Sequence, residues 1–492
     1  MANMKPNPNP TIKYSKIFIN NEWHSSVSGK EFPVINPSNE KVIIQVAEAD
    51  KADVDIAVAA ARAAFKRGAA WRKMDASARG EMIRKLADLL DENASELASI
   101  QSLENGKPFA NSFEEVQRSA KVFRYYAGCV DKIHGSTIPA DGDVFVMTRK
   151  EPLGVVGAII PWNYPVTMVG MKLGPALATG CTIVLKPAEQ TPLTALYIAN
   201  LTKEAGFPKG VLNVVPGYGD PAGSALAEHL DVNKVAFTGS VGVGKKIMEI
   251  SARSNLKRVT LELGGKSPLV VFDDADLELA VTYTTLAFLN AGQICLAPTR
   301  IFVQSSIYDK FVSMVVNRAS SLKVGGPFEP DAFYGSQIDD RIFKKVLDYI
   351  EIGKREGAKL ETGGNRHGSV GFFVQPTVFS NVRDDMTIAK EEIFGPVQSL
   401  FKFDTLEEVI KRANNTSYGL ASGVFTKSLD IALEFSKAIE AGTVWVNQWF
   451  KLTGQTPFGG YKQSGIGREL GIEALDNYME VKTINIKLPS NH

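Results

Sequence analysis

The feature that most constrains the fold is a regular alternation of short apolar runs and helix-forming segments between residues 154 and 272. Buried parallel strands are continuous apolar runs, and consecutive parallel strands need a crossover connection, which is usually a helix. Predicted strands cover 155–160, 182–185, 211–215, 234–237, 259–261 and 269–272. Predicted helices cover 169–178, 193–205, 222–229 and 244–254. The pattern predicts an α/β protein with a parallel sheet of the nucleotide-binding type.

A second αβ unit is expected beyond Asp276. At 492 residues the chain is long enough for two to four domains, at roughly 100 to 200 residues each. A capping-box-like Ser306-x-x-Asp309 precedes one of the predicted helices. Predicted helices cover 276–289, 308–322, 340–356, 406–414 and 429–441, and predicted strands cover 377–381 and 443–447.

The remaining segments are predicted to be peripheral. Residues 17–46 have the turn signals of a hairpin, and 54–65 and 76–100 have the apolar spacing of scaffold helices. Residues 145–149 and 478–487 alternate like strands. An exposed strand edge would be an aggregation hazard on its own, so assembly into an oligomer is expected.

Bulk composition excludes several classes of function. A net charge of +1 gives no reason to expect nucleic acid or an anionic membrane as partner. The longest apolar stretch, 153–162, is far shorter than the ~18 residues of a spanning helix. Residues 1–16 lack the features of a signal or transit peptide, and we expect a flexible tail on a cytoplasmic protein. Three cysteines and five scattered histidines predict neither a disulfide framework nor a metal site.

Two short segments suggest covalent chemistry. Cys295 follows Gly292 at the end of an apolar, helix-like run, and Glu262 ends a β-like run upstream. A thiol can attack a substrate, and a carboxylate on another element can serve as base. Taken alone, such a cysteine is more often an inert buried residue, and such a glutamate is more often a surface charge.

A glycine-rich loop at 239–246 follows a predicted strand and opens a helix, where backbone amides could hold a pyrophosphate. It nearly spells the P-loop of kinases and ATPases, but Lys246 replaces the required Ser or Thr. It does not match GxGxxG either, and a purely structural turn is the other alternative. The turn at 161–165 places Asn163 beside Trp162, where its amide could be a fixed donor to an oxyanion.

Together these motifs resemble the aldehyde dehydrogenase superfamily over nearly the whole chain. The resemblance rests on Glu-Leu-Gly-Gly-Lys at 262–266, Gly-Gln-x-Cys at 292–295, and the segments 159–165, 237–244, 390–396 and 457–465. It is closest to the class of NAD-dependent oxidoreductases that act on aliphatic aldehydes and retinal. It implies a Rossmann-type cofactor domain (1–133 and 153–264), an α/β catalytic domain (265–477) and a small β oligomerisation element (134–152 and 478–492).

The resemblance also assigns residues. It makes Cys295 the nucleophile that passes through a thioester, Asn163 the oxyanion donor with the Cys295 amide, Glu262 the base and Lys172 an ordering residue. The cofactor residues it implies are Ile159, Ile160, Pro161, Trp162, Lys186, Glu189, Gly219, Phe237, Gly239, Ser240, Gly264, Glu392 and Phe394. The substrate residues are Tyr164, Met168, Met171, Phe450, Leu452 and Phe458.

Further expectations follow from the same resemblance. Lys186 and Glu189 would hold the adenine ribose, and because a carboxylate repels a 2′-phosphate, Glu189 favours NAD over NADP. A homotetramer, or at least a dimer, is expected, with an apolar aldehyde as substrate and no metal.

The chain departs from the family pattern at three places. Cys295 lies 33 residues after Glu262, one fewer than the family arrangement, so the helix before the thiol must lose a residue. Ile294 and Leu296 replace cysteines common in the closest class, and 450–452 differ at the substrate tunnel. Two alternatives stay open, a catalytically silent, crystallin-like protein on the same fold and a cysteine hydrolase, although no histidine lies near either signature segment.

Overall fold

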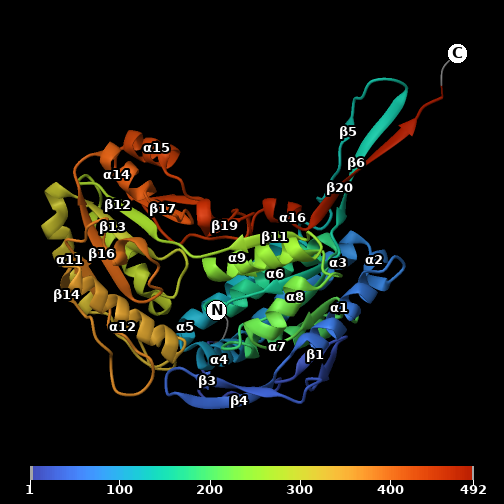
Figure 1. Ribbon diagram of the computed structural model, residues 1–492, viewed down its shortest axis with the longest axis horizontal. Coiled ribbons are helices and arrows are strands. Elements are labelled where there is room, and N and C mark those ends of the chain that lie inside the picture. The colour runs from blue at the N-terminus through green and yellow to red at the C-terminus, as the bar shows by residue number, and fades with distance from the viewer. Residues whose placement is uncertain (1–3, 490–492) are drawn as a thin grey trace.

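The computed structural model describes residues 4–489, which form two large sheets, one three-stranded sheet and one two-stranded sheet (Figure 1). The first sheet has the order β19-β11-β10-β7-β8-β9-β1-β2. Its parallel centre is β11 (Arg258–Glu262), β10 (Lys234–Thr238), β7 (Val155–Ile159), β8 (Thr182–Lys186) and β9 (Leu212–Val214). The antiparallel edges are β19 (Gly465–Ile466), β1 (Ile17–Ile19) and β2 (Glu22–His24). The crossover segments contain α6 (Pro165–Thr179), α7 (Leu193–Ala205), η1 (Gly219–Gly223), α8 (Ser224–Glu228) and α9 (Val241–Ser254).

One predicted strand of this sheet belongs elsewhere. The run at 269–272 falls largely in β12 (Ser267–Val271), which pairs with β13 and β17 of the second sheet and not with β11. An apolar run signals burial on both faces, but it carries no information about which sheet supplies the neighbours. The chain therefore passes from one sheet to the other directly after β11.

The second sheet has the order β14-β15-β16-β13-β12-β17-β18, and only β14 is antiparallel to its neighbour. Its other strands are β13 (Pro298–Gln304), β14 (Lys359–Thr362), β15 (Thr377–Ser380), β16 (Val397–Phe403), β17 (Ala421–Phe425) and β18 (Thr443–Val446). Its helices are α10 (Leu277–Thr284), η2 (Thr285–Gly292), η3 (Ser305–Ile307), α11 (Tyr308–Ser320), α12 (Asp340–Arg355), α13 (Thr387–Lys390), α14 (Leu406–Asn414) and α15 (Leu429–Ala438).

A three-stranded arm projects from the body of the molecule (Figure 1). It consists of β5 (Thr137–Ile138), β6 (Val144–Pro152) and β20 (Met479–Lys487), with β6 between the other two strands. Its apolar side chains include Val481, which is 64% exposed, and Phe145 and Ile486, which are also exposed. The short elements η4 (Lys462–Ser464) and α16 (Glu473–Asp476) precede β20.

The amino-terminal third differs from expectation in three respects. The hairpin predicted at 17–46 is two pairs, β1 with β2 and β3 (Glu31–Asn36) with β4 (Lys41–Ala47). The predicted helix 76–100 breaks at Asn93 into α3 (Ala76–Glu92) and α4 (Ala94–Asn105), because asparagine favours helix ends. The other helices here are α1 (Lys51–Phe65), α2 (Ala70–Lys73) and α5 (Phe109–Ala127).

The predicted flexible tail is the third difference, although residues 1–3 lie outside the described part. Asn7 N–H donates to Ser99 Oγ at 3.1 Å, and the Tyr14 ring stacks on Trp23 with centroids 4.7 Å apart. These contacts hold the segment against α4 and β2. A composition rich in Pro and Asn does not indicate such long-range contacts. Within residues 4–489 no helix is long and apolar enough to cross a membrane.

Candidate active site

The thiol lies on an irregular loop between the two sheets. The predicted helix 276–289 is α-helical only to Thr284 and continues as η2. The last three residues of η2 all have positive φ: Asn290 (48°), Ala291 (55°) and Gly292 (74°). A Cβ added to Gly292 would lie 2.0 Å from the Gly395 carbonyl oxygen, so only glycine fits. This loop delivers Cys295 three residues before β13.

Half-buried Cys295 opens into a mainly apolar pocket, the kind of lining that is typical of small-molecule sites. The pocket brings together all six residues expected to contact substrate; they come from α6 and its N-cap Tyr164, from the loop at 450–452 and from Phe458. The sequence did not indicate Arg118, on α5, which also lines this pocket. The other lining residues are Ser119, Val122, Thr167, Ile294, Leu296, Thr453, Gly454 and Leu470.

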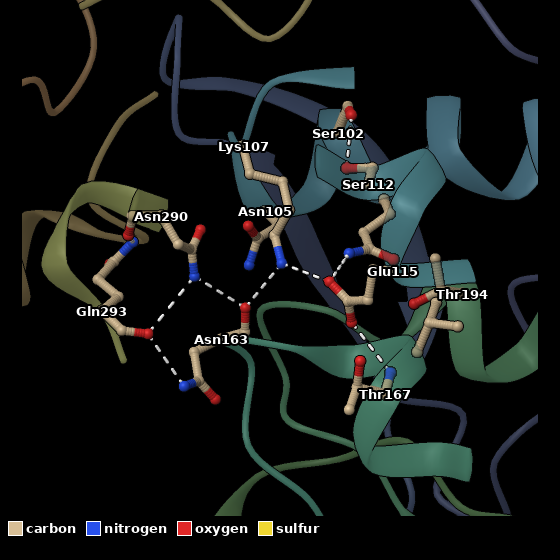
Figure 2. Close-up of polar contacts among 12 residues, drawn as sticks. Ser102, Asn105, Lys107, Ser112, Glu115, Asn163, Thr167, Thr194, Asn290 and Gln293 are labelled. Carbon is tan, nitrogen blue, oxygen red and sulfur yellow. Dashed lines mark hydrogen bonds and ion pairs between the residues drawn. The ribbon is translucent and has the colours of Figure 1, made fainter. Parts of the chain in front are cut away.

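Asn163 lies four residues after the end of β7 and is hydrogen-bonded to the thiol loop (Figure 2). Its side-chain Nδ2 donates to the Gln293 carbonyl at 3.0 Å, and its own carbonyl accepts from Asn290 Nδ2 at 2.9 Å. An amide nitrogen carries two hydrogens, so one N–H of Asn163 remains for a ligand. The predicted donor and the predicted nucleophile are therefore parts of one hydrogen-bonded unit.

Glu262 ends β11 and is 5% exposed, with Oε2 lacking a hydrogen-bond partner among the described residues. Burial, reinforced by the charge of Glu469 and opposed by Lys172, holds the pKa of Glu262 well above its usual 4.5. Burial, followed by the charges of Glu392 and Glu262, also raises the pKa of the Cys295 thiol. A carboxylate with a raised pKa is a competent proton acceptor near neutral pH.

Lys172 forms an ion pair with Glu469, and both side chains are buried. Sequence reasoning found the lysine on α6 but missed the glutamate, which lies in an irregular segment with no local pattern around it. Lys172 thus influences the site in two ways: it pairs with Glu469, and its positive charge lowers the pKa of Glu262.

The predicted cofactor residues gather at the carboxyl ends of the first sheet's strands. Lys186 ends β8, and its Nζ donates to the carbonyls of Pro187 and Gly217, both at 2.7 Å; burial lowers its pKa to about 8. Ser240 caps α9 through the Val243 amide, next to Gly242, where an added Cβ would meet nothing within 4 Å. An open helix N-terminus of this kind fits the phosphates of a dinucleotide.

A second group of the predicted cofactor residues, which includes Glu392, lies nearer the Cys295 thiol. Glu392 accepts from the Gly265 amide at 3.1 Å, and burial raises its pKa to about 7. A Cβ on Gly264 would lie 2.3 Å from the Glu392 carboxylate, so the two segments approach closely only because Gly264 has no side chain. The rings of Trp162 and Phe394 pack edge to face at 5.4 Å. Gly219 begins η1 at the exposed rim.

Among residues 4–489 no group of three or more His, Cys, Asp and Glu is placed to hold a metal ion. A thiol and a buried carboxylate, placed where a dinucleotide-type sheet meets a second α/β unit, define a cofactor-dependent oxidoreductase of the covalent, thiol-using class.

Comparisons with known proteins agree with that class. The profile of the aldehyde dehydrogenase family matches residues 23–484. "Aldehyde dehydrogenase 1A1" of Rattus norvegicus is 59% identical over 98% of this chain and 97% of its own, and "Retinal dehydrogenase 2" of Homo sapiens is 56% identical over 99% and 94%. The NAD+ complex of aldehyde dehydrogenase from Bacillus cereus superposes with a TM-score of 0.95, at 50% identity over 97% of each chain. The chain belongs to the aldehyde dehydrogenase family, and NAD-dependent oxidation of an aldehyde is its activity.

Proposed function

We propose that this protein oxidises medium-sized to large apolar aldehydes, retinal among them, to carboxylic acids through a thioester on Cys295. The observation that carries the proposal is the opening of the Cys295 thiol into a pocket walled mainly by apolar side chains. The names of the relatives, aldehyde dehydrogenase and retinal dehydrogenase, support the same substrate class.

In the first step the Cys295 sulfur attacks the aldehyde carbon and the carbonyl oxygen becomes an oxyanion. The remaining N–H of Asn163 and the backbone N–H of Cys295 are the donors we assign to it. Since burial keeps the thiol protonated, its proton must leave as the C–S bond forms, and the buried carboxylate of Glu262 is the acceptor in the site. NAD, when bound, supplies the hydride acceptor, and loss of the hydride leaves Cys295 acylated.

Hydrolysis of the thioester needs a water nucleophile and a base. Once Glu262 has passed the thiol's proton on to solvent, its Oε2, which has no hydrogen-bond partner among the described residues, can accept a proton from water. The Lys172–Glu469 pair contributes opposite charges near Glu262, with Glu469 raising and Lys172 lowering its pKa. We assign Lys172 the role of offsetting, through its positive charge, the rise in the pKa of Glu262 that burial and Glu469 cause.

For the cofactor, Lys186 and Glu189 would hold the adenine ribose, the first turn of α9 the pyrophosphate, and Glu392 and Phe394 the nicotinamide end. The half-buried carboxylate of Glu189 disfavours a 2′-phosphate, which supports preference for NAD over NADP. We divide the chain by function as the sequence predicts, into a cofactor domain (1–133 and 153–264), a catalytic domain (265–477) and an oligomerisation element (134–152 and 478–492).

We further propose a homotetramer, or at least a dimer, formed through the β5-β6-β20 arm. Its exposed apolar residues Val481, Ile486 and Phe145 support this, because an apolar arm projecting into water is unfavourable unless it is covered. A cytoplasmic location is supported by three cysteines that are all free, as expected in a reducing compartment.

The direct test measures NADH formation with retinal, a medium-chain aliphatic aldehyde, an aromatic aldehyde and betaine aldehyde, a small charged one. We expect the apolar aldehydes to give the highest kcat/KM and Cys295→Ser to abolish acid production. Preference for the small charged aldehyde would contradict the substrate proposal. A structural protein would form no NADH at all, and a cysteine hydrolase would turn over its substrate equally well without NAD.

A further inference from the structure

A buried ion pair lies beside the active site without belonging to the groups assigned above. Lys107 follows the end of α4, and Glu115 lies on α5; each is 2% exposed, and Lys107 Nζ is 2.6 Å from Glu115 Oε2. Burial lowers the pKa of Lys107, and the charge of Glu115 opposes that shift. Burying two charges offers little net stability compared with apolar packing, so the pair calls for another explanation.

Both side chains are hydrogen-bonded to the turn that carries Asn163 (Figure 2). Lys107 Nζ donates to the Asn163 carbonyl at 2.9 Å and lies 4.1 Å from the centre of the Tyr164 ring. Glu115 Oε1 accepts from the Thr167 amide at 3.0 Å, in the first turn of α6. The cation therefore holds the start of the turn and the anion holds its end.

Further hydrogen bonds connect this turn to the thiol loop. The Asn163 carbonyl accepts hydrogen bonds from both Lys107 Nζ and Asn290 Nδ2. Asn290 Nδ2 also lies 3.5 Å from the Gln293 carbonyl oxygen. That same carbonyl accepts from the Asn163 side chain, which closes a ring of hydrogen bonds two residues before Cys295. The ring fixes both where the Asn163 amide points and where the thiol begins.

We propose that Lys107 and Glu115 are positioning residues, which set the oxyanion donor Asn163 against the thiol loop through this ring. The inference rests on the role proposed above for Asn163. Neither side chain lines the substrate pocket, so each acts through Asn163 and not on the aldehyde. A donor shifted by a fraction of an ångström loses much of its value in the transition state while substrate still binds.

The test uses the charge-neutral double variant Lys107→Met/Glu115→Gln, which leaves no unpaired buried charge and keeps an amide oxygen for Thr167 N–H. We expect kcat to fall about 10- to 100-fold with KM within about threefold of wild type. The matched control is Lys257→Met, another buried lysine that donates to a carbonyl, that of Ala227, and does not line the pocket; its kinetics should equal those of wild type.

A double-mutant cycle separates positioning from general damage. In an Asn163→Ala background the Lys107/Glu115 changes should cost less than twofold further, because the group they position is gone. Equal losses in both backgrounds, or a wild-type kcat in the double variant, would overturn the inference. If the double variant is unfolded by circular dichroism, Lys107→Arg, which keeps both buried charges paired but changes the contact with the Asn163 carbonyl, provides the same comparison. Absence of NADH formation by the wild-type protein would instead refute the proposed function.

Discussion

Replacing Glu262 by glutamine removes a base while keeping the side chain's size and shape. The carboxylate is buried at the end of β11, and its Oε2 has no hydrogen-bond partner among the described residues. General-base catalysis contributes about 10²- to 10⁴-fold, which corresponds to about 3–5 kcal/mol of the barrier. We expect kcat to fall by that factor in the steady-state NADH assay.

The pH dependence follows from the raised pKa. The base acts when deprotonated, so wild-type kcat should rise with pH through the pKa of Glu262, which burial and Glu469 hold well above 4.5. The glutamine variant should lack this rising limb. A variant kcat within tenfold of wild type, or an unchanged pH profile, would refute the role of Glu262.

The same change should stabilise the protein. Because the folded pKa exceeds the unfolded value, the folded state holds its proton longer, and wild-type stability falls as pH rises from about 4.5 through the folded pKa. Glutamine cannot ionise, so at pH 8 the variant should gain about 1–3 kcal/mol in unfolding free energy, shrinking toward pH 5. Thermal unfolding at fixed protein concentration measures this, and equal stability at pH 8 would contradict the assigned burial cost.

Three other changes test separate parts of the proposal. Glu189→Gln should raise kcat/KM for NADP about tenfold relative to NAD, because it removes the repulsion of the 2′-phosphate; an unchanged ratio would contradict that role. Arg118→Met removes a cation from the pocket wall. It should lower kcat/KM for 4-carboxybenzaldehyde about 5- to 10-fold relative to kcat/KM for benzaldehyde. Val481→Lys, in the exposed arm, should shift the oligomer toward smaller species in sedimentation velocity, whereas an unchanged distribution would place the interface elsewhere.

The sequence predicted the elements that repeat a simple period. Helix 193–205 coincides with α7, and five strands of the first sheet lie where the apolar runs place them. The same logic failed at β12, whose sheet depends on tertiary neighbours, and at Asn93, where one polar residue divides a continuous amphipathic pattern. Local patterns report burial and propensity, but sheet membership is decided by contacts distant in sequence.

For the candidate site, sequence motifs pointed to individual residues but not to the partners that surround them. Cys295, Glu262 and Asn163 lie in recognisable segments, and the six expected pocket residues do line one pocket. Glu469, Lys107 and Glu115 have no signal of their own, because a charged residue bound for the interior looks in sequence like one on the surface. Their role becomes visible only when the chain brings them to within 3 Å of a backbone group or an opposite charge.

The contact between Gly292 and the Gly395 carbonyl limits how this protein can be redesigned. The first residue belongs to the loop that presents the sulfur, and the second directly follows Phe394, which we assign to the nicotinamide end of the cofactor. Any side chain introduced at position 292 would push both segments apart at once. Substitutions meant to change aldehyde preference are therefore better placed in the parts of the pocket wall that α5, α6 and the 450–452 loop supply, away from this contact.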